Sequence, residues 1–165
     1  MTTPSAPIWC VDTSSIIAVR SLFSRADAAQ ARNAFTQLAA AGRLCFPPEV
    51  VAELERYGGK DNPALHWAKE NHDSAVRAAA FDDVREVLRH VPEVVDTDKE
   101  GVEDADPYVL AIAMRLVGDG KDARIVTEEF KTTAAKMNLG SAAGYLRIPS
   151  MSLRAMLKFE GVVDF

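Results

Sequence analysis

Short apolar segments alternate along this chain with longer stretches of helical character, and this alternation constrains the fold more than any other feature. Apolar and β-branched residues dominate positions 8–11 and 123–127, a composition typical of buried strands. Further strands are predicted at residues 43–46 and 147–151. No hairpin-type turn joins these segments, so the strands are predicted to be parallel, with helices on both faces of the sheet. The sequence therefore predicts an α/β domain with a central parallel sheet.

The stretches between the predicted strands carry the terminal signals of helices. Ser14 or Ser15 is expected to cap the first helix, and Gly42 ends an alanine-rich helix. Pro107 suits the first turn of a strongly apolar helix. An acidic, turn-rich loop precedes that helix, at residues 94–106. The helices are predicted at residues 16–23, 26–41, 49–58, 62–80, 81–90, 106–118 and 152–161.

The length and composition are those of one globular domain. The 165 residues are enough to bury a core, and 48% of them are hydrophobic, so a single domain is predicted over residues 1–165. Residues 1–7 lack the basic and apolar parts of a secretory signal and are expected to form a disordered leader. No apolar run approaches the length of a membrane span, so a cytoplasmic protein without a membrane contact is expected.

The charge and the cysteines exclude several classes of protein. A net charge of −5 argues against a non-specific nucleic-acid binder, which would carry a basic excess. It leaves room for an enzyme that meets nucleic acid through a metal, because such a site is rich in carboxylates. Cys10 and Cys45 lie in predicted strands and lack zinc-type spacing, so they are predicted to be small buried residues. The histidines are predicted to lie on the surface: His66, His72 and His90.

Acidic residues occur where an α/β domain builds its binding sites. Ligands bind beyond the carboxyl ends of parallel strands, and Asp12 and Thr127 each lie at such an end. Taken singly, an acid at a helix start can be a simple cap, and an acid on a helix can face solvent. The other candidate acids are Glu53 on a helix, Asp104 and Asp106 before the apolar helix, and Glu128 and Glu129 after the strand at 123–127.

Taken together, these acids favour a metal site. Clustered carboxylates repel one another unless a cation compensates them, and hard oxygen ligands suit Mg²⁺ or Mn²⁺. Such a metal activates water and stabilises the charge that builds up on a phosphodiester. The hydroxyls of Ser14 and Thr127 are candidates to hold metal-bound water or a phosphate oxygen. The residues therefore predict a site for the hydrolysis of phosphodiester bonds.

The ordered motifs VDTSS, PPEVVAELERY, DADPYVLAIAM and IVTEE resemble those of the PIN-domain family of metal-dependent ribonucleases. The resemblance covers residues 8–157 and is strongest to the prokaryotic branch that includes VapC-type toxins of toxin–antitoxin pairs, with features of a side branch rather than a standard toxin. It implies a three-layer α/β/α sandwich, a Mg²⁺ or Mn²⁺ site, and endonucleolytic cleavage of RNA by activated water. It also implies a homodimer and an antitoxin protein as partner.

The resemblance assigns roles by position. Asp12 matches the family's central metal ligand, and Ser14 matches the small polar residue that follows it. Glu53 matches the glutamate of the third helix, and Asp106 matches the aspartate that opens the apolar helix.

The fourth acid departs from the family's pattern. It is usually an aspartate two residues after a threonine, here Thr127, so Glu129 is the match and Glu128 is its neighbour. Whether Asp104 is a further ligand stays open. Candidate RNA contacts are Arg20, Arg25, Arg56, Lys60 and Lys131.

Alternative functions are weighed against the same residues. A non-catalytic PIN-like module that binds RNA or a protein partner fits the glutamate at the fourth position and the acidic charge. A haloacid-dehalogenase-type phosphotransferase requires a second aspartate where this chain has Ser14. A receiver domain requires a lysine after a late strand and a central phosphoacceptor aspartate, and IVTEE supplies neither. A dinucleotide enzyme requires a GxGxxG turn, which does not follow the first strand.

Overall fold

The computed structural model describes residues 3–58, 61–98 and 104–163 and contains a four-stranded parallel sheet. The order of the strands across the sheet is β2-β1-β3-β4. The strands are β1 (Ile8–Val11), β2 (Leu44–Cys45), β3 (Ala123–Val126) and β4 (Ser150–Met151). Each lies within a segment predicted to be a strand, although β2 and β4 are only two residues long.

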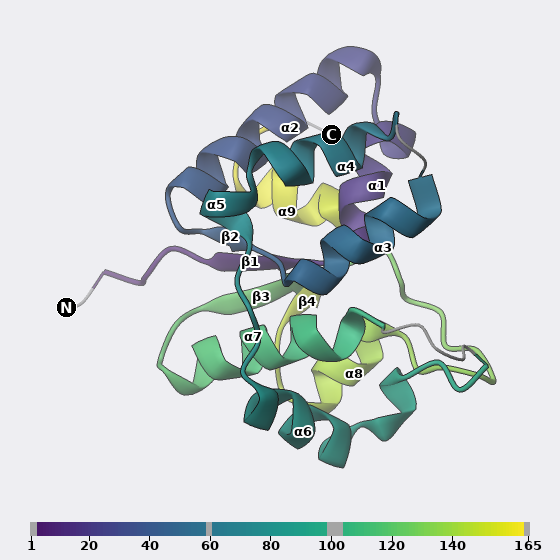
Figure 1. Ribbon diagram of the computed structural model, residues 1–165. Coiled ribbons are helices and arrows are strands. Elements are labelled where there is room, and N and C mark those ends of the chain that lie inside the picture. Colours follow the sequence, from purple (N-terminus) through teal and green to yellow (C-terminus); the bar gives the residue numbers. More distant parts are fainter. Residues whose placement is uncertain (1–2, 59–60, 99–103, 164–165) are drawn as a thin grey trace.

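The helices fill the intervals between the strands. Their bounds are α1 (Thr13–Leu22), α2 (Arg25–Ala40), α3 (Pro48–Gly58), α4 (Pro63–Glu70), α5 (His72–Ala75), α6 (Phe81–His90), the 3₁₀ helix η1 (Pro92–Val94), α7 (Asp106–Gly118), α8 (Leu139–Tyr145) and α9 (Leu153–Phe159). Figure 1 shows α1, α2, α4 and α9 on one side of the sheet and α6, α7 and α8 on the other. The predicted three-layer α/β/α sandwich is therefore confirmed.

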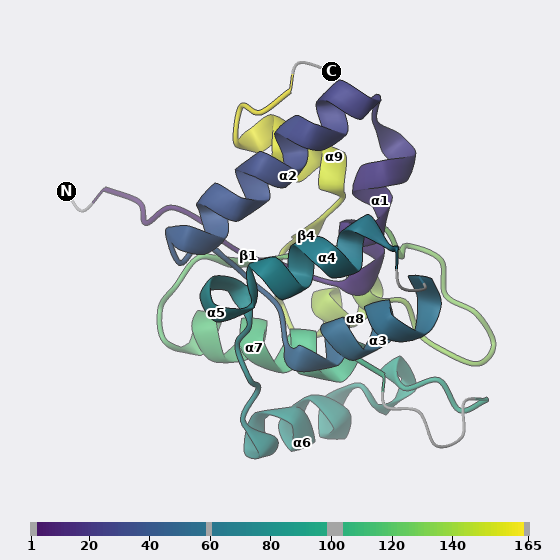
Figure 2. The ribbon, with the colours of Figure 1, turned by 45° about the horizontal axis from the view of Figure 1, so that its top comes forward.

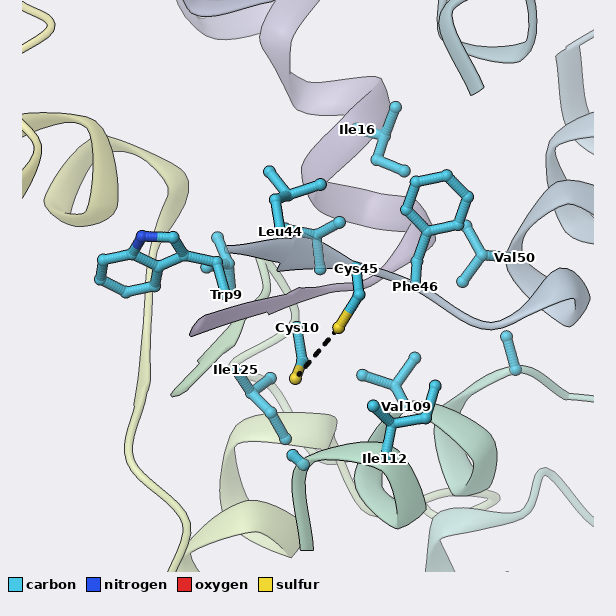
Figure 3. Close-up of a cluster of buried hydrophobic side chains, with 14 of the residues drawn as sticks. Trp9, Cys10, Ile16, Leu44, Cys45, Phe46, Val50, Val109, Ile112 and Ile125 are labelled. Carbon is cyan, nitrogen blue, oxygen red and sulfur yellow. Dashed lines mark hydrogen bonds between the residues drawn. The ribbon is translucent and has the colours of Figure 1, made fainter. Parts of the chain in front are cut away.

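Side chains of β1 alternate between the two helical layers. Trp9 is fully buried on the side of α9, where its Nε1 donates to Glu160 Oε1 at 2.7 Å. Cys10 lies directly opposite Cys45 of β2 in the register, and their Sγ atoms are 3.8 Å apart. Both thiols belong to the buried core beside Ile112 of α7 (Figure 3). The prediction that both cysteines are buried is confirmed.

One predicted helical stretch is interrupted. Residues 62–80 form α4 and the short α5, after which the chain becomes extended. Phe46 forms a parallel bridge with Val76 and accepts a hydrogen bond from the Arg77 amide at 2.9 Å. The prediction of helix through residue 80 is wrong, because the edge of the sheet beside β2 offers backbone partners that outweigh the helical propensity of the alanines.

Residues 3–7 precede β1 and form the described part of the expected leader. Pro7 is buried, and its carbonyl accepts a hydrogen bond from Arg43 Nε at 3.0 Å, so the expected leader is anchored at its end. Residues 1–2 and residues 99–103 of the predicted acidic loop lie outside the described residues. Within the described part of the chain, no helix has both the length and the apolar character that spanning a membrane requires.

Candidate metal centre

Asp12 follows β1 directly and serves as the N-cap of α1. Its backbone is extended, and its Oδ1 accepts a hydrogen bond from the Ser15 amide at 2.9 Å. The prediction that Ser14 or Ser15 caps this helix is therefore wrong, because the aspartate comes first along the chain and reaches the free amide of the first turn. The hydroxyls of Ser14, Ser15 and Thr127 also donate to this carboxylate, at 2.6–2.8 Å. The Asp12 side chain therefore both caps α1 and belongs to the candidate site.

The two predicted hydroxyl residues join the carboxyl ends of β1 and β3. Ser14 Oγ accepts from the Glu128 amide at 3.0 Å, and Thr127 Oγ1 accepts from the Glu129 amide at 3.0 Å. Each hydroxyl also donates to Asp12. The loop after β3 is consequently tied to the first turn of α1, which fixes where Glu129 projects.

Glu53 aligns the two helices that present the aspartates. Its Oε2 accepts from Thr13 Oγ1 at 2.5 Å, and its Oε1 accepts from the Ala105 amide at 2.7 Å. Thr13 begins α1, and Ala105 is the residue before Asp106, which begins α7. Because each carboxylate oxygen of Glu53 accepts a hydrogen bond from the protein, this side chain links the start of α1 to the start of α7 beside the carboxylate cluster.

The remaining acids separate into those that converge and one that does not. Oxygen atoms of Asp12, Asp106 and Glu129 lie within 4.8 Å of one another. Asp104 adjoins them, and its Oδ1 accepts from the Asp106 amide at 3.2 Å. Glu128 turns away from the cluster and accepts from the Leu153 amide at 2.6 Å, at the start of α9. The structure therefore brings Glu129, rather than its neighbour, to the other acids.

Lys136 is the residue of the site that the sequence analysis missed. Its Nζ lies 2.6 Å from Asp106 Oδ2, 3.3 Å from Asp104 Oδ2 and 3.6 Å from Glu129 Oε2. Only 16% of its side chain is exposed. It lies in a polar segment without helical or strand periodicity, so no pattern in the sequence marks it.

A pairing of two loops places this lysine. The segment after β3 runs beside the segment after α6 along one edge of the molecule (Figures 1 and 2). The Thr97 amide donates to the Ala135 carbonyl at 3.4 Å, and the Met137 amide donates to the Glu93 carbonyl at 2.7 Å. Backbone contacts on both sides of Lys136 thus direct its side chain toward the carboxylates.

Burial is the largest single influence on the pKa values of the site. It raises the pKa of Asp12 to about 6, against hydrogen bonds from Thr127 and Ser15 that act to lower it. Burial also raises the pKa of Asp106 well above its ordinary value, and the Lys136 ammonium opposes this rise. Burial acts to lower the pKa of Lys136, but the charges of Asp106 and its neighbours outweigh it and raise the pKa above the ordinary value. The carboxylates therefore stabilise the Lys136 ammonium, and a carboxylate charge without a nearby cation is costly in this buried site.

The cluster opens into a cavity of about 180 Å³. Ile17 and Tyr57 line it together with the acids, and their exposed fractions are 37% and 56%. A second cavity of about 380 Å³ adjoins it and shares Glu129 and Lys136 as lining residues. An apolar and aromatic rim suits a ligand that has a flat ring, and the carboxylate floor could meet a negatively charged group only through a bound cation.

The donor set fits a hard divalent cation. Asp12, Asp106 and Glu129 supply only carboxylate oxygens, the ligand type that Mg²⁺ and Mn²⁺ prefer. The ammonium of Lys136 shows independently that the cluster requires positive charge, because it is drawn to three carboxylates while largely buried. Asp12, Asp106 and Glu129 could hold the metal, and Asp104 lies close enough to become a further ligand after a change of its side-chain conformation.

The candidate RNA contacts lie in different parts of the molecule. Lys131 lines the 380 Å³ cavity, and the Arg56 guanidinium lies 6.0 Å from the centre of the Tyr57 ring. Arg20 lines a separate hollow at the far end of α1. Lys60 lies outside the described residues.

The raised pKa of Asp12 makes the stability of the metal-free protein depend on pH. The folded protein binds this proton more tightly than the unfolded chain does, so the contribution of Asp12 to stability is complete below pH 4 and is lost as the pH rises through about 6. We measure the free energy of unfolding by urea denaturation in EDTA. Between pH 4 and pH 7.5, we expect this free energy to fall in the wild type by on the order of 3 kcal/mol relative to Asp12→Asn. A difference between the two proteins that stays constant over this range would contradict the assignment.

Comparison with known proteins yields a family and nothing finer. A family model described as "Domain of unknown function (DUF4411)" matches residues 9–163. No curated protein and no solved structure shows a significant match. The matched range includes all the residues of the carboxylate cluster and the whole sheet except Ile8, the first residue of β1.

Proposed function

This chain belongs to the DUF4411 family, whose description assigns no activity, and we propose from its site that it is a metal-dependent endoribonuclease. The observation that carries the proposal is the convergence of Asp12, Asp106 and Glu129 within 4.8 Å at the carboxyl ends of β1 and β3. Three carboxylates from distant parts of the chain meet there at a cavity open to solvent. Oxygen-only sites of this kind suit Mg²⁺ or Mn²⁺, which serve the hydrolysis of phosphodiesters.

The choice of RNA rests on the resemblance of the motifs to the PIN-domain family. The parts of the chain that carry it are VDTSS, PPEVVAELERY, DADPYVLAIAM and IVTEE, and each contributes an acid at or beside the site. A VapC-type toxin with an antitoxin partner and a homodimeric assembly are proposed on the same ground. The apolar residues of α1 are mostly core, with Ile16 and Val19 buried and Ile17 at the cavity, so they offer little surface for such partners.

The residues divide the work of the proposed reaction. Asp12, Asp106 and Glu129 would hold the metal, which would supply Lewis-acid activation of water and compensation of negative charge on the phosphate. Ser14 and Thr127 orient the Asp12 carboxylate through their hydroxyl groups. The rim then positions the nucleotide over the acids.

Two further residues complete the arrangement. Glu53 keeps the first turns of α1 and α7 at a constant distance, because it binds one donor from each. Lys136 neutralises the acids and brings a positive charge to the place where a phosphate would lie.

A non-catalytic module that binds RNA or a protein is the second candidate, and Lys136 is the observation that favours it. An ammonium that already pairs with Asp104, Asp106 and Glu129 could be a permanent substitute for a metal ion. The same site would then be structural.

Cleavage of a circular single-stranded RNA distinguishes the two candidates. We expect the protein to linearise the circle in the presence of Mn²⁺ or Mg²⁺ and to lose this activity in EDTA, because the opening of a circle requires an internal cut. The measurement is the appearance of the linear product on a denaturing gel. An intact circle together with no detectable Mn²⁺ binding would assign the site to the non-catalytic module.

A further inference from the structure

A hollow of about 440 Å³ is lined by residues from the end of α1 and the start of α2. Figure 2 shows where these two helices meet in the ribbon. Arg20 reaches it from α1, and Arg25 and Arg32 reach it from α2. Phe23, in the turn between the helices, supplies an aromatic wall, and Asp61 is the acid among the residues that line the hollow. Positive charge therefore dominates this part of a protein whose net charge is −5.

Among the described residues, the guanidinium groups in the hollow lack the carboxylate partners that several other arginines have. Within the described residues, Arg20, Arg25 and Arg32 make no side-chain ion pair or hydrogen bond. Several other arginines pair with a carboxylate: Arg43 with Glu160, Arg89 with Glu86, Arg115 with Asp83 and Arg124 with Asp122. Three unpaired charges of the same sign around one hollow repel one another, and an anionic ligand would remove this repulsion.

The walls of the hollow suit a nucleotide chain in particular. A planar guanidinium donates two parallel hydrogen bonds to a phosphate, which makes arginine the preferred contact for phosphodiesters. The Phe23 ring is held by Arg154, whose guanidinium carbon lies 5.4 Å from the ring centre and whose Nη2 donates to the Leu22 carbonyl at 2.8 Å. Arginines beside a fixed aromatic ring are typical of surfaces that bind single strands through phosphate contacts and base stacking.

The hollow continues the carboxylate cavity along one helix. Thr13, Ser14 and Ile17 of α1 line the carboxylate cavity, and Arg20 lies one turn beyond Ile17. The helix rises about 1.5 Å per residue, so Ser14 and Arg20 are about 9 Å apart along its axis. One strand could therefore have a phosphate at the acids and a neighbouring part of its backbone among the arginines.

We propose that the hollow lined by Arg20, Arg25 and Arg32 binds the phosphate backbone of the single-stranded RNA whose scissile bond lies at the carboxylate cluster. This inference rests on the proposed ribonuclease function and names the form of its substrate and the side from which the strand extends. The carboxylates themselves repel a polyanion, so the arginines supply the binding energy that the site lacks.

The test measures binding in the absence of metal, so that it does not depend on cleavage. A fluorescein-labelled single-stranded oligoribonucleotide of mixed sequence is titrated with protein in EDTA, and polarisation is recorded at several salt concentrations. The hollow variant is Arg20→Ala/Arg25→Ala/Arg32→Ala. The control variant is Arg77→Ala/Arg85→Ala/Arg89→Ala, which has the same net charge but loses arginines that lie outside the hollow. Circular dichroism checks that both are folded, and Arg20→Gln/Arg25→Gln replaces the hollow variant if the triple substitution unfolds.

We expect the hollow variant to bind at least about 10-fold more weakly than the wild type and the control to change by less than about 3-fold. The dependence of log K on log salt should also become shallower by about 2 in the hollow variant, because three phosphate contacts at about 0.7 each are lost. Equal binding by both variants would overturn the proposal. Equal competition by poly-glutamate and by unlabelled RNA would overturn it in favour of an acidic protein partner. RNA binding that is normal in the wild type and weakened in the hollow variant, without cleavage in Mn²⁺, would instead refute the proposed ribonuclease function and leave only the RNA-binding role of the hollow.

Discussion

Asp106→Asn is expected to weaken Mn²⁺ binding at least about 100-fold and to slow RNA cleavage about 1000-fold, which is ~4 kcal/mol of lost transition-state stabilisation. Asp106 is one of three acids whose oxygens converge, and it is 4% exposed, so water cannot replace it easily as a ligand. The substitution removes the charge and keeps the shape of the side chain. The fold should survive, because Lys136 keeps Asp104 and Glu129 as partners and because burial makes the charge of Asp106 costly in the metal-free protein.

The measurement is a calorimetric Mn²⁺ titration followed by a single-turnover cleavage assay. Asp119→Asn serves as the control, because it makes the same change of charge at the exposed C-terminal end of the same helix. It should leave both binding and cleavage within about 2-fold of the wild type. Wild-type affinity for Mn²⁺ in the Asp106→Asn protein would contradict the metal site.

The two adjacent glutamates provide an internal comparison for the same experiment. Glu129→Gln should weaken Mn²⁺ binding, since Glu129 belongs to the cluster. Glu128→Gln should leave it unchanged, since this side chain accepts from the Leu153 amide at the start of α9. If the two substitutions had equal effects on Mn²⁺ affinity, the direction assigned to these side chains would be wrong.

Lys136→Met is expected to destabilise the metal-free protein and to strengthen metal binding. The substitution leaves Asp104, Asp106 and Glu129 without the ammonium that now compensates them. Breaking a largely buried charge pair on one side costs about 3 kcal/mol, or roughly 6–12 °C in Tm for a domain of this size. Mn²⁺ would then bind without displacing the lysine, so its affinity should rise about 10-fold or more.

Thermal unfolding in EDTA and in Mn²⁺ measures both effects at once. The Tm of Lys136→Met should lie below the wild-type value in EDTA, and added Mn²⁺ should raise it by more degrees than it raises the wild type. Lys131→Met makes the same change at an exposed position of the same loop and should alter neither value appreciably. A Tm unchanged in EDTA would show that Lys136 does not compensate the cluster, and an unchanged Mn²⁺ affinity would show that it does not compete with the metal.

Much of the fold follows from local patterns. The strands were predictable because β1 and β3 are short apolar runs rich in β-branched residues, and a fully buried strand has few other solutions. The start of α9 was predictable because Ser152 supplies a cap, and its Oγ does accept from the Ala155 amide. The stretch at residues 76–80 was not, since the bridge between Phe46 and Val76 is made by backbone groups far apart in the sequence. Local propensity carries no information about such a partner.

For the candidate site, too, some features follow from the sequence and others depend on tertiary contacts. By itself, the sequence determined which acids stand at the ends of strands and helices, because parallel strands bring their carboxyl ends to one edge of the sheet. The family resemblance favoured Glu129 over Glu128 as the fourth acid, but only the tertiary structure showed that Glu129 joins Asp12 and Asp106 while Glu128 turns away, since two neighbouring side chains leave a turn in different directions. The tertiary structure also decided that Lys136 reaches the acids, because two paired loops set its position. Periodicity reports which side of an element is buried, whereas a charge held by a loop depends on contacts between segments that no local pattern records.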